Sequence, residues 1–293
     1  MASYTKSILF VLIAGVCWSW IGVIVKLIDD ANTWQILFYR SLGMVPILLF
    51  FVGVKTRNNP FKSLANLRLP SFIGALCLVG AYLGGIYAYQ TTTIANAAFL
   101  FAAAPFFTAV FAWPILREPV RNGTWWAILF ALIGVIIMVR EGLALGALSG
   151  NISALGSAIG FAGFTIALRW DKETDVLPMV ILGGILAIFI TGLILVFSGT
   201  GFSINTNDIL LTVVVAASIL GCGMVCYTVG SRVVTATDLA LLAMVEVALA
   251  PLWGFILINE PLGINNLIGG LLILGSLVFN ALTGIRHKPT KVS

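Results

Sequence analysis

Two charged side chains, Glu246 and Arg40, lie inside long apolar runs of this 293-residue sequence. An ionised side chain at the centre of a bilayer costs about 2.5–3.5 kcal/mol on insertion scales, so such groups usually face a cavity or a partner. A carboxylate and a guanidinium that face one cavity can hold the ammonium and the carboxylate of an amino acid. The alternatives are that the two side chains neutralise each other, or that Arg40 is purely structural.

Glu246 is also the candidate for proton coupling. A carboxyl group that is neutral in one state of a cycle, and charged and in contact with substrate in another, acts as a switch. The competing interpretation is that Glu246 pairs with a neighbouring helix and holds the bundle together.

Aromatic side chains inside the apolar runs are candidates for the remaining wall of a substrate site. They are Trp18, Tyr82, Phe161 and Tyr227. Small residues such as Gly84 and Gly223 lie near the two tyrosines, and small neighbours leave room for a ring to project into a cavity. An aromatic wall suits apolar or aromatic substrates and can contact an ammonium group by cation–π attraction. Packing or interfacial anchoring is the alternative for these rings.

No catalytic or metal-binding constellation accompanies these residues. The only histidine, His287, lies in the C-terminal tail, and the sequence shows no paired aspartates at metal spacing and no phosphate-binding glycine loop. Cys17, Cys77, Cys222 and Cys226 lie inside apolar runs, which favours reduced, structural thiols. A soft-metal site at the last two cysteines would lack histidine and acidic partners. A membrane-embedded enzyme is therefore disfavoured, and no metal or cofactor is expected.

Composition identifies the class of protein. Hydrophobic residues make up 60% of the chain and charged residues only 9%, whereas a soluble domain carries charges at about a quarter of its positions. A cytosolic enzyme, a secreted disulfide scaffold and a disordered protein are excluded. The net charge of +5 comes from basic residues that lie mostly between apolar runs. This distribution indicates membrane topology rather than a nucleic-acid partner.

The positioning elements are ten apolar runs, each close to the length that a helix needs to cross a bilayer. They cover residues 7–28, 33–53, 70–90, 94–116, 122–139, 152–168, 177–197, 208–229, 238–258 and 264–283. We therefore expect an all-α integral membrane protein with ten transmembrane helices.

The distribution of Lys and Arg predicts the orientation of these spans. If the N-terminus is cytoplasmic, the inner loops and tails hold Lys6, Lys55, Arg57, Lys62, Arg68, Arg117, Arg121, Arg169, Lys172, Arg232, Arg286, Lys288 and Lys291. Only Lys26 and Arg140 lie at outer ends. Because the span number is even, both termini are predicted to be cytoplasmic.

A weak internal repeat relates the two halves of the chain. An offset of 142 places the Glu-Pro pair at 260–261 on the pair at 118–119, and Asp238 on Asn96. The repeat predicts a first five-helix unit at residues 1–142 and a second at 143–293. Since five is an odd number, the second unit must be inverted in the membrane.

Two details follow from the repeat. Asn96 and Asp238 are expected to cap the fourth and ninth spans. Pro105 and Pro251 are one helical turn out of step with the repeat, so we expect them to kink their helices at different depths. Interrupted inner helices in an inverted repeat indicate a site near the midplane, between the halves.

The sequence resembles the EamA-type permeases of the drug/metabolite transporter superfamily. The resemblance is carried by GVCWSWIGVIVK at 15–26, YQTTTIANAAFLFAAAPFFTAVFAWPILREP at 89–119, DLALLAMVEVALAPLWGFILINEP at 238–261 and LIGGLLILGSLVF at 267–279. The order and spacing of these segments cover almost the whole chain.

This resemblance implies ten helices in two inverted five-helix repeats around a central cavity, and transport of small metabolites by alternating access. It implies a multi-pass protein of the bacterial inner membrane that exports amino acids or related zwitterions, with proton coupling as an added hypothesis. The alternatives are export of amphipathic cations and drugs, or carriage of other small organic metabolites. A bundle of this size can enclose its own cavity, so a functional monomer is expected.

Overall fold

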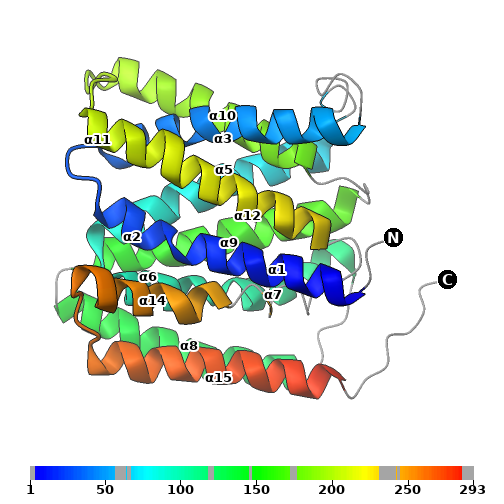
Figure 1. The fold of residues 1–293 in the computed structure, drawn as a ribbon. Coiled ribbons are helices and arrows are strands. Elements are labelled where there is room, and N and C mark those ends of the chain that lie inside the picture. Colours follow the sequence, from blue (N-terminus) through cyan, green and yellow to red (C-terminus); the bar gives the residue numbers. More distant parts are fainter. Residues whose placement is uncertain are drawn as a thin grey trace.

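The chain folds into a helical bundle, drawn in Figure 1. The computed structural model describes residues 4–56, 64, 67–117, 122–144, 147–171, 177–230, 242 and 245–285. Several predicted features lie outside these described residues: the side chains of Arg57, Lys62, Arg121, Lys172, Arg232, Arg286, Lys288, Lys291, Glu118 and Asp238.

The first half contains seven described helical segments. They are α1 (Tyr4–Ser19), α2 (Ile21–Lys26), α3 (Thr33–Thr56), α5 (Leu69–Thr91), α6 (Ile94–Phe101), α7 (Ala104–Leu116) and α8 (Asn122–Ala144). The second half follows the same plan. Its segments are α9 (Leu148–Asp171), α10 (Leu177–Phe197), α11 (Thr206–Ile209), the π-helix η1 (Leu210–Ala216), α12 (Ala217–Gly230), α14 (Val245–Ile258) and α15 (Ile264–Ile285).

Within the described residues, eight helical stretches are long and apolar enough to cross a membrane. Two shorter apolar helices, Val245–Ile258 and Ile264–Ser276, take the places of the ninth and tenth predicted spans. The prediction of an all-helical membrane protein with this span order is confirmed.

Two predicted spans are not continuous helices. The first breaks at Trp20, between α1 and α2, and the fourth breaks at residues 102–103, between α6 and α7. Pro105 lies in the first turn of α7, where its missing N–H costs no helical hydrogen bond. Pro251, by contrast, lies inside α14 without ending that helix. The two prolines therefore differ in their place within the helix, and the expectation that they kink their helices at different depths stays a prediction.

The prediction that Asn96 caps the fourth span is wrong. Thr93 is the N-cap of α6, and its side chain accepts a hydrogen bond from the backbone N–H of Asn96. The Asn96 amide instead donates to Thr92 and to Asn151, which lies on α9. Its side chain therefore joins the two halves rather than ending a helix.

The two halves run in opposite directions through the bundle. In Figure 1 the first helix, α1, runs from the N-terminal end towards the opposite end, whereas α9, the first helix of the second half, runs the other way. The N-terminus and the end of α15 lie at the same end of the molecule (Figure 1). We name that end the terminal end, and the opposite one the Glu260 end.

The helix pairs with the most extensive packing join one half to the other. The first-half helices α1, α3, α5 and α8 pack on α12, α10, α9 and α15, respectively. Glycine allows close approaches between these helices: a Cβ placed on Gly160 of α9 would lie 2.7 Å from the carbonyl oxygen of Cys77 on α5. The inverted units are thus interleaved.

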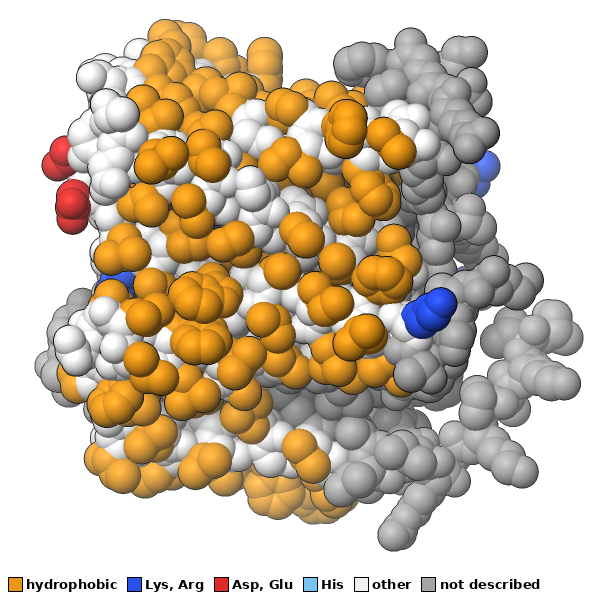
Figure 2. Space-filling view, viewed as in Figure 1, with side chains coloured by type: hydrophobic (Ala, Val, Ile, Leu, Met, Phe, Trp, Pro, Cys, Tyr) orange, Lys and Arg blue, Asp and Glu red, His pale blue; other side chains and the backbone are white. Residues whose placement is uncertain are grey.

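The outer surface of the bundle is apolar, which is what lipid solvation requires. Large hydrophobic side chains such as Phe50, Phe197 and Leu271 are 75%, 84% and 68% exposed. Figure 2 shows hydrophobic side chains across the whole visible face, with charged ones confined to its two edges. The four cysteines are free.

Candidate functional site

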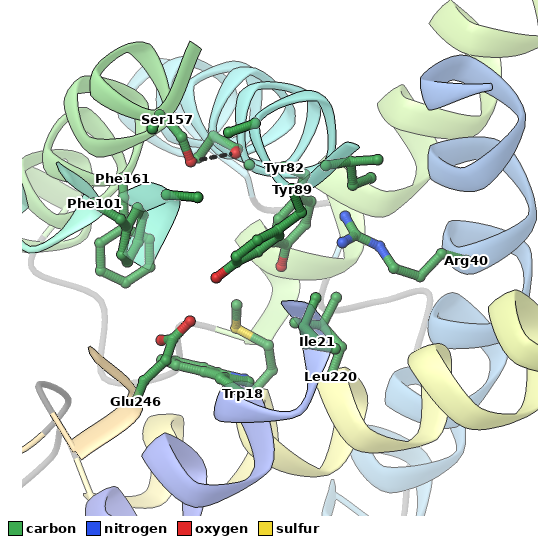
Figure 3. A pocket seen from close by; sticks show the side chains of 17 residues that line it. Trp18, Ile21, Arg40, Tyr82, Tyr89, Phe101, Ser157, Phe161, Leu220 and Glu246 are labelled. Carbon is green, nitrogen blue, oxygen red and sulfur yellow. Dashed lines mark hydrogen bonds between the residues drawn. The ribbon is translucent and has the colours of Figure 1, made fainter. Parts of the chain in front are cut away.

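A cavity of about 660 Å³, its open mouth included, lies between the two halves. Helices from both halves line it: α1, α2, α3, α5 and α6 from the first, and α9, α12 and α14 from the second. Five of the six residues predicted to bind substrate lie on its wall, namely Trp18, Arg40, Tyr82, Phe161 and Glu246. Figure 3 shows how their side chains converge.

Arg40 reaches the cavity from α3, and no acidic residue in the described part of the chain pairs with it there. Its side chain is buried, with 3% exposure, and its guanidinium carbon lies 4.4 Å from the centre of the Tyr82 ring. Nε and Nη2 are buried without a hydrogen-bond partner. A buried cation held only by an aromatic face can accept an anionic group, because such a group would supply the missing hydrogen bonds.

Glu246 approaches the cavity from α14, which begins at Val245 in the described structure. In Figure 3 its carboxylate and the Arg40 guanidinium come from opposite sides, with the rings of Tyr82 and Tyr89 between them. Between these two described residues the structure shows no ion pair. Of the alternatives that the sequence left open, mutual neutralisation is therefore not what this conformation shows.

Aromatic side chains form the wall between α1, α6 and α9. Trp18 meets the Phe161 ring edge-on, with centroids 6.4 Å apart, and Phe101 lies 5.5 Å from Phe161. Tyr227 does not line the cavity. It packs behind Trp18, with ring centroids 5.2 Å apart, and therefore supports the wall from α12.

Both broken helices meet the cavity at their breaks. Trp18 and Ile21 line it on either side of the break between α1 and α2, and Phe101 lines it at the last turn of α6. Helix breaks at the depth of a cavity are typical of the binding sites of inverted-repeat transporters, because they expose backbone polar groups to a substrate.

A protein-family model describes this chain twice. The model of the EamA-like transporter family matches residues 5–140 and again residues 148–282. The chain belongs to the EamA-like transporter family. It is therefore a multi-pass membrane protein of a transporter family rather than of an enzyme family, which confirms the family resemblance of the sequence.

Known relatives of this EamA chain include transporters. It is 28% identical over 177 residues to human solute carrier family 35 member G1, a match that covers 53% of this chain and 45% of the human protein. It is 24% identical over 208 residues to an uncharacterised transporter of Clostridium kluyveri, covering 66% of this chain and 65% of that one. The chain thus spans less than half of the human relative.

A solved structure shares the fold of the EamA chain over nearly its full length. That crystal structure superimposes with a TM-score of 0.69, covering 97% of this chain and all of the other, at 17% sequence identity. At this identity the similarity concerns the fold alone.

Three polar or aromatic residues of the EamA cavity were not predicted from the sequence: Tyr89, Phe101 and Ser157. Tyr89 lies seven residues after Tyr82 on α5, and that spacing of two helical turns places both rings on one face. This periodicity could have identified Tyr89. The hydroxyl of Ser157 donates to the Ala81 carbonyl oxygen at 2.6 Å, a contact between halves with no local signal.

Polar contacts join the two halves at the Glu260 end of the EamA bundle. Glu260 Oε1 lies 3.5 Å from Lys26 Nζ, and its Oε2 accepts the Ile94 backbone N–H at 2.7 Å. Nearby, the Asp208 carboxylate accepts the backbone N–H groups of Asp29, Asp30 and Ala31. We name the Glu260 contacts with Lys26 and Ile94 the Glu260 clasp.

Proposed function

We propose that this chain carries amino acids or closely related zwitterions across the membrane by alternating access. The supporting observation is that Arg40 and Glu246 line one aromatic-walled cavity from opposite sides. The Arg40 guanidinium is buried, and two of its nitrogens lack a hydrogen-bond partner. The guanidinium suits the substrate carboxylate and Glu246 suits its ammonium group. The rings between them suit an apolar side chain.

The same observation weighs against amphipathic cations as the main substrates. A cation entering the cavity would gain from Glu246 and the aromatic rings but would meet the unpartnered charge of Arg40 without supplying an acceptor. A zwitterion satisfies both ends. Other small carboxylated metabolites remain the alternative class.

The proposed cycle uses the two halves, residues 1–142 and 143–293, as the units that move. The Glu260 clasp joins the halves at one end in the present conformation, and alternate opening of that end and of the terminal end would expose the cavity to each side of the membrane in turn. The proposal places a monomer in a bacterial inner membrane with both termini in the cytoplasm. Export is the proposed direction, with proton coupling through Glu246.

The test of the substrate class is transport by the purified protein in proteoliposomes. The probes are labelled amino acids, each matched with the carboxylic acid that lacks its amine and the amine that lacks its carboxylate. Arg40→Gln should weaken amino-acid binding at least tenfold, because a hydrogen bond to a charged group contributes about 1.5–3 kcal/mol. Arg140→Gln makes the same chemical change at an exposed position of α8 and should transport normally.

Two outcomes would contradict the proposal. Transport of the matched amines at the rate of the amino acids, unchanged by Arg40→Gln, would favour the amphipathic-cation alternative. Failure of the whole panel with folded protein would remove the amino-acid hypothesis.

Proton coupling needs a separate experiment. Glu246→Gln should abolish transport that is driven by an imposed pH gradient and leave substrate exchange intact, because exchange needs no net proton movement. If the variant keeps the pH dependence of the parent protein, Glu246 is not the coupling residue.

A further inference from the structure

The indole of Trp18 contacts α12 at a single glycine, Gly223. A Cβ placed on Gly223 would lie 2.6 Å from Cδ1 and 3.1 Å from Cε2 of Trp18, and closer still to Nε1. The three atoms nearest to that Cβ all belong to this indole. Glycine is therefore the residue that lets the ring occupy its present position.

Packing alone holds the indole there. Tyr227, one helical turn after Gly223 on α12, lies 5.2 Å from the ring, and Phe161 meets its edge from α9. The indole Nε1 is buried and has no hydrogen-bond partner. Because no hydrogen bond fixes the indole, the surface of α12 determines how far Trp18 projects into the cavity.

We propose that Gly223 is a positioning residue that sets the size limit for substrates by keeping Trp18 withdrawn against α12. The inference rests on the proposed function, because it takes the cavity to be the transport site. Trp18 forms the cavity wall on one side and contacts Gly223 on the other. A methyl group at 223 would displace the ring by about 1 Å to restore ordinary carbon–carbon separation, and the ring would enter the space of the substrate.

The experiment compares Gly223→Ala with Gly221→Ala on the same helix. A Cβ on Gly221 would lie 3.4 Å from Ile47, an ordinary contact, and Gly221 does not line the cavity. Both variants are labelled with 5-fluorotryptophan, and the Trp18 resonance is assigned by its loss in Trp18→Val. We expect the Trp18 fluorine signal to move in Gly223→Ala and to stay in place in Gly221→Ala.

Transport then tests specificity. For a panel of amino acids with side chains of increasing size, Gly223→Ala should lower kcat/KM for the largest relative to the smallest by about tenfold or more, because a methylene in a fitted pocket changes discrimination by about 10–200-fold. Trp18→Val removes the three ring atoms that the new Cβ would meet. In that background Gly223→Ala should leave the size preference unchanged, since the two positions act as one unit.

Each outcome is decisive. An unmoved Trp18 signal in Gly223→Ala, or an equal loss of size preference with and without the indole, would overturn the inference. If the wild-type protein transports none of the panel, the proposed function fails, while the fluorine spectra still decide whether Gly223 positions Trp18. If Gly223→Ala does not fold, folding of the double variant with Trp18→Val supports the contact, and its failure to fold overturns it.

Discussion

Replacing Glu260 by glutamine should open the Glu260 end of the bundle. In the present conformation this carboxylate binds Lys26 at 3.5 Å and accepts the Ile94 N–H at 2.7 Å. Lys26 and Ile94 belong to the first half and Glu260 to the second, so the clasp must break if the halves separate at this end. Glutamine keeps an oxygen acceptor for Ile94 but loses the charge.

The size of the effect follows from the two contacts. The side chains of Lys26 and Glu260 are 25% and 14% exposed, and a partly solvated ion pair contributes about 0.2–1 kcal/mol. A hydrogen bond to a charged acceptor contributes about 1.5–3 kcal/mol, and a neutral one about 0.5–1.5 kcal/mol. The substitution therefore costs the closed state about 1.5 kcal/mol, which is about a tenfold change in the ratio of closed to open molecules.

Labelling of a buried cysteine measures that ratio. Ile21 is 8% exposed and lies on the cavity wall, between the break at Trp20 and the clasp. In a background without the four native cysteines, Ile21→Cys should react with a membrane-impermeant maleimide that is added only from the side of the Glu260 end, and only in molecules that have opened at that end. When opening and closing are fast, the labelling rate is proportional to the open fraction. Glu260→Gln should thus label about ten times faster than the parent.

The control is Asp29→Asn, which removes a carboxylate from an exposed position at the same end. It should label at the parental rate. Equal acceleration by both variants would mean that local charge, and not the clasp, controls access. An unchanged rate in Glu260→Gln would refute the assignment of a closing role to these contacts.

Three further substitutions test the packing and the site. Gly160→Ala should lower the free energy of unfolding by about 1–3 kcal/mol, because its methyl group would press on the backbone of α5. Gly156→Ala, one turn away with nothing within 4 Å of its added Cβ, should leave the thermal midpoint in detergent unchanged or raise it. Asp208→Asn should lower the thermal midpoint, since its carboxylate accepts three backbone N–H groups between α2 and α3; an unchanged midpoint would show that these bonds contribute little. Tyr82→Leu should weaken amino-acid binding up to tenfold more than Tyr82→Phe, measured by competition in proteoliposomes, because only phenylalanine keeps a ring beneath Arg40.

The sequence predicts those features of this protein whose physical signal is local. Apolar runs of sufficient length specify the spans wherever they occur. A lone charge in such a run is costly by itself, so Glu246 and Arg40 could be selected before any contact was known. Their separation without an ion pair could not be predicted, because it depends on how α3 and α14 are placed across the cavity.

Local signals fail where one residue serves a distant helix. From the local sequence, Glu260 is expected to lie at a corner before a proline. Its carboxylate instead accepts the backbone N–H of Ile94, 166 positions earlier in the chain. Asn96 has the residue type of an N-cap, but Thr93 takes that role and Asn96 binds across to α9. In both cases the residue type suggests a role at its own helix end and gives no sign of the partner in the other half.

The interleaving of the halves explains why the contacts that the sequence did not predict lie around the cavity. Because each major packing contact joins a helix of one half to a helix of the other, the cavity wall consists of residues whose neighbours are far away in sequence. From the sequence alone, a glycine such as Gly223 could serve helix flexibility or close packing. The contact with the Trp18 ring, which the structure shows, favours close packing. In the proposed alternating-access cycle such contacts must differ between the two states, since contacts within one half would not change when the halves move.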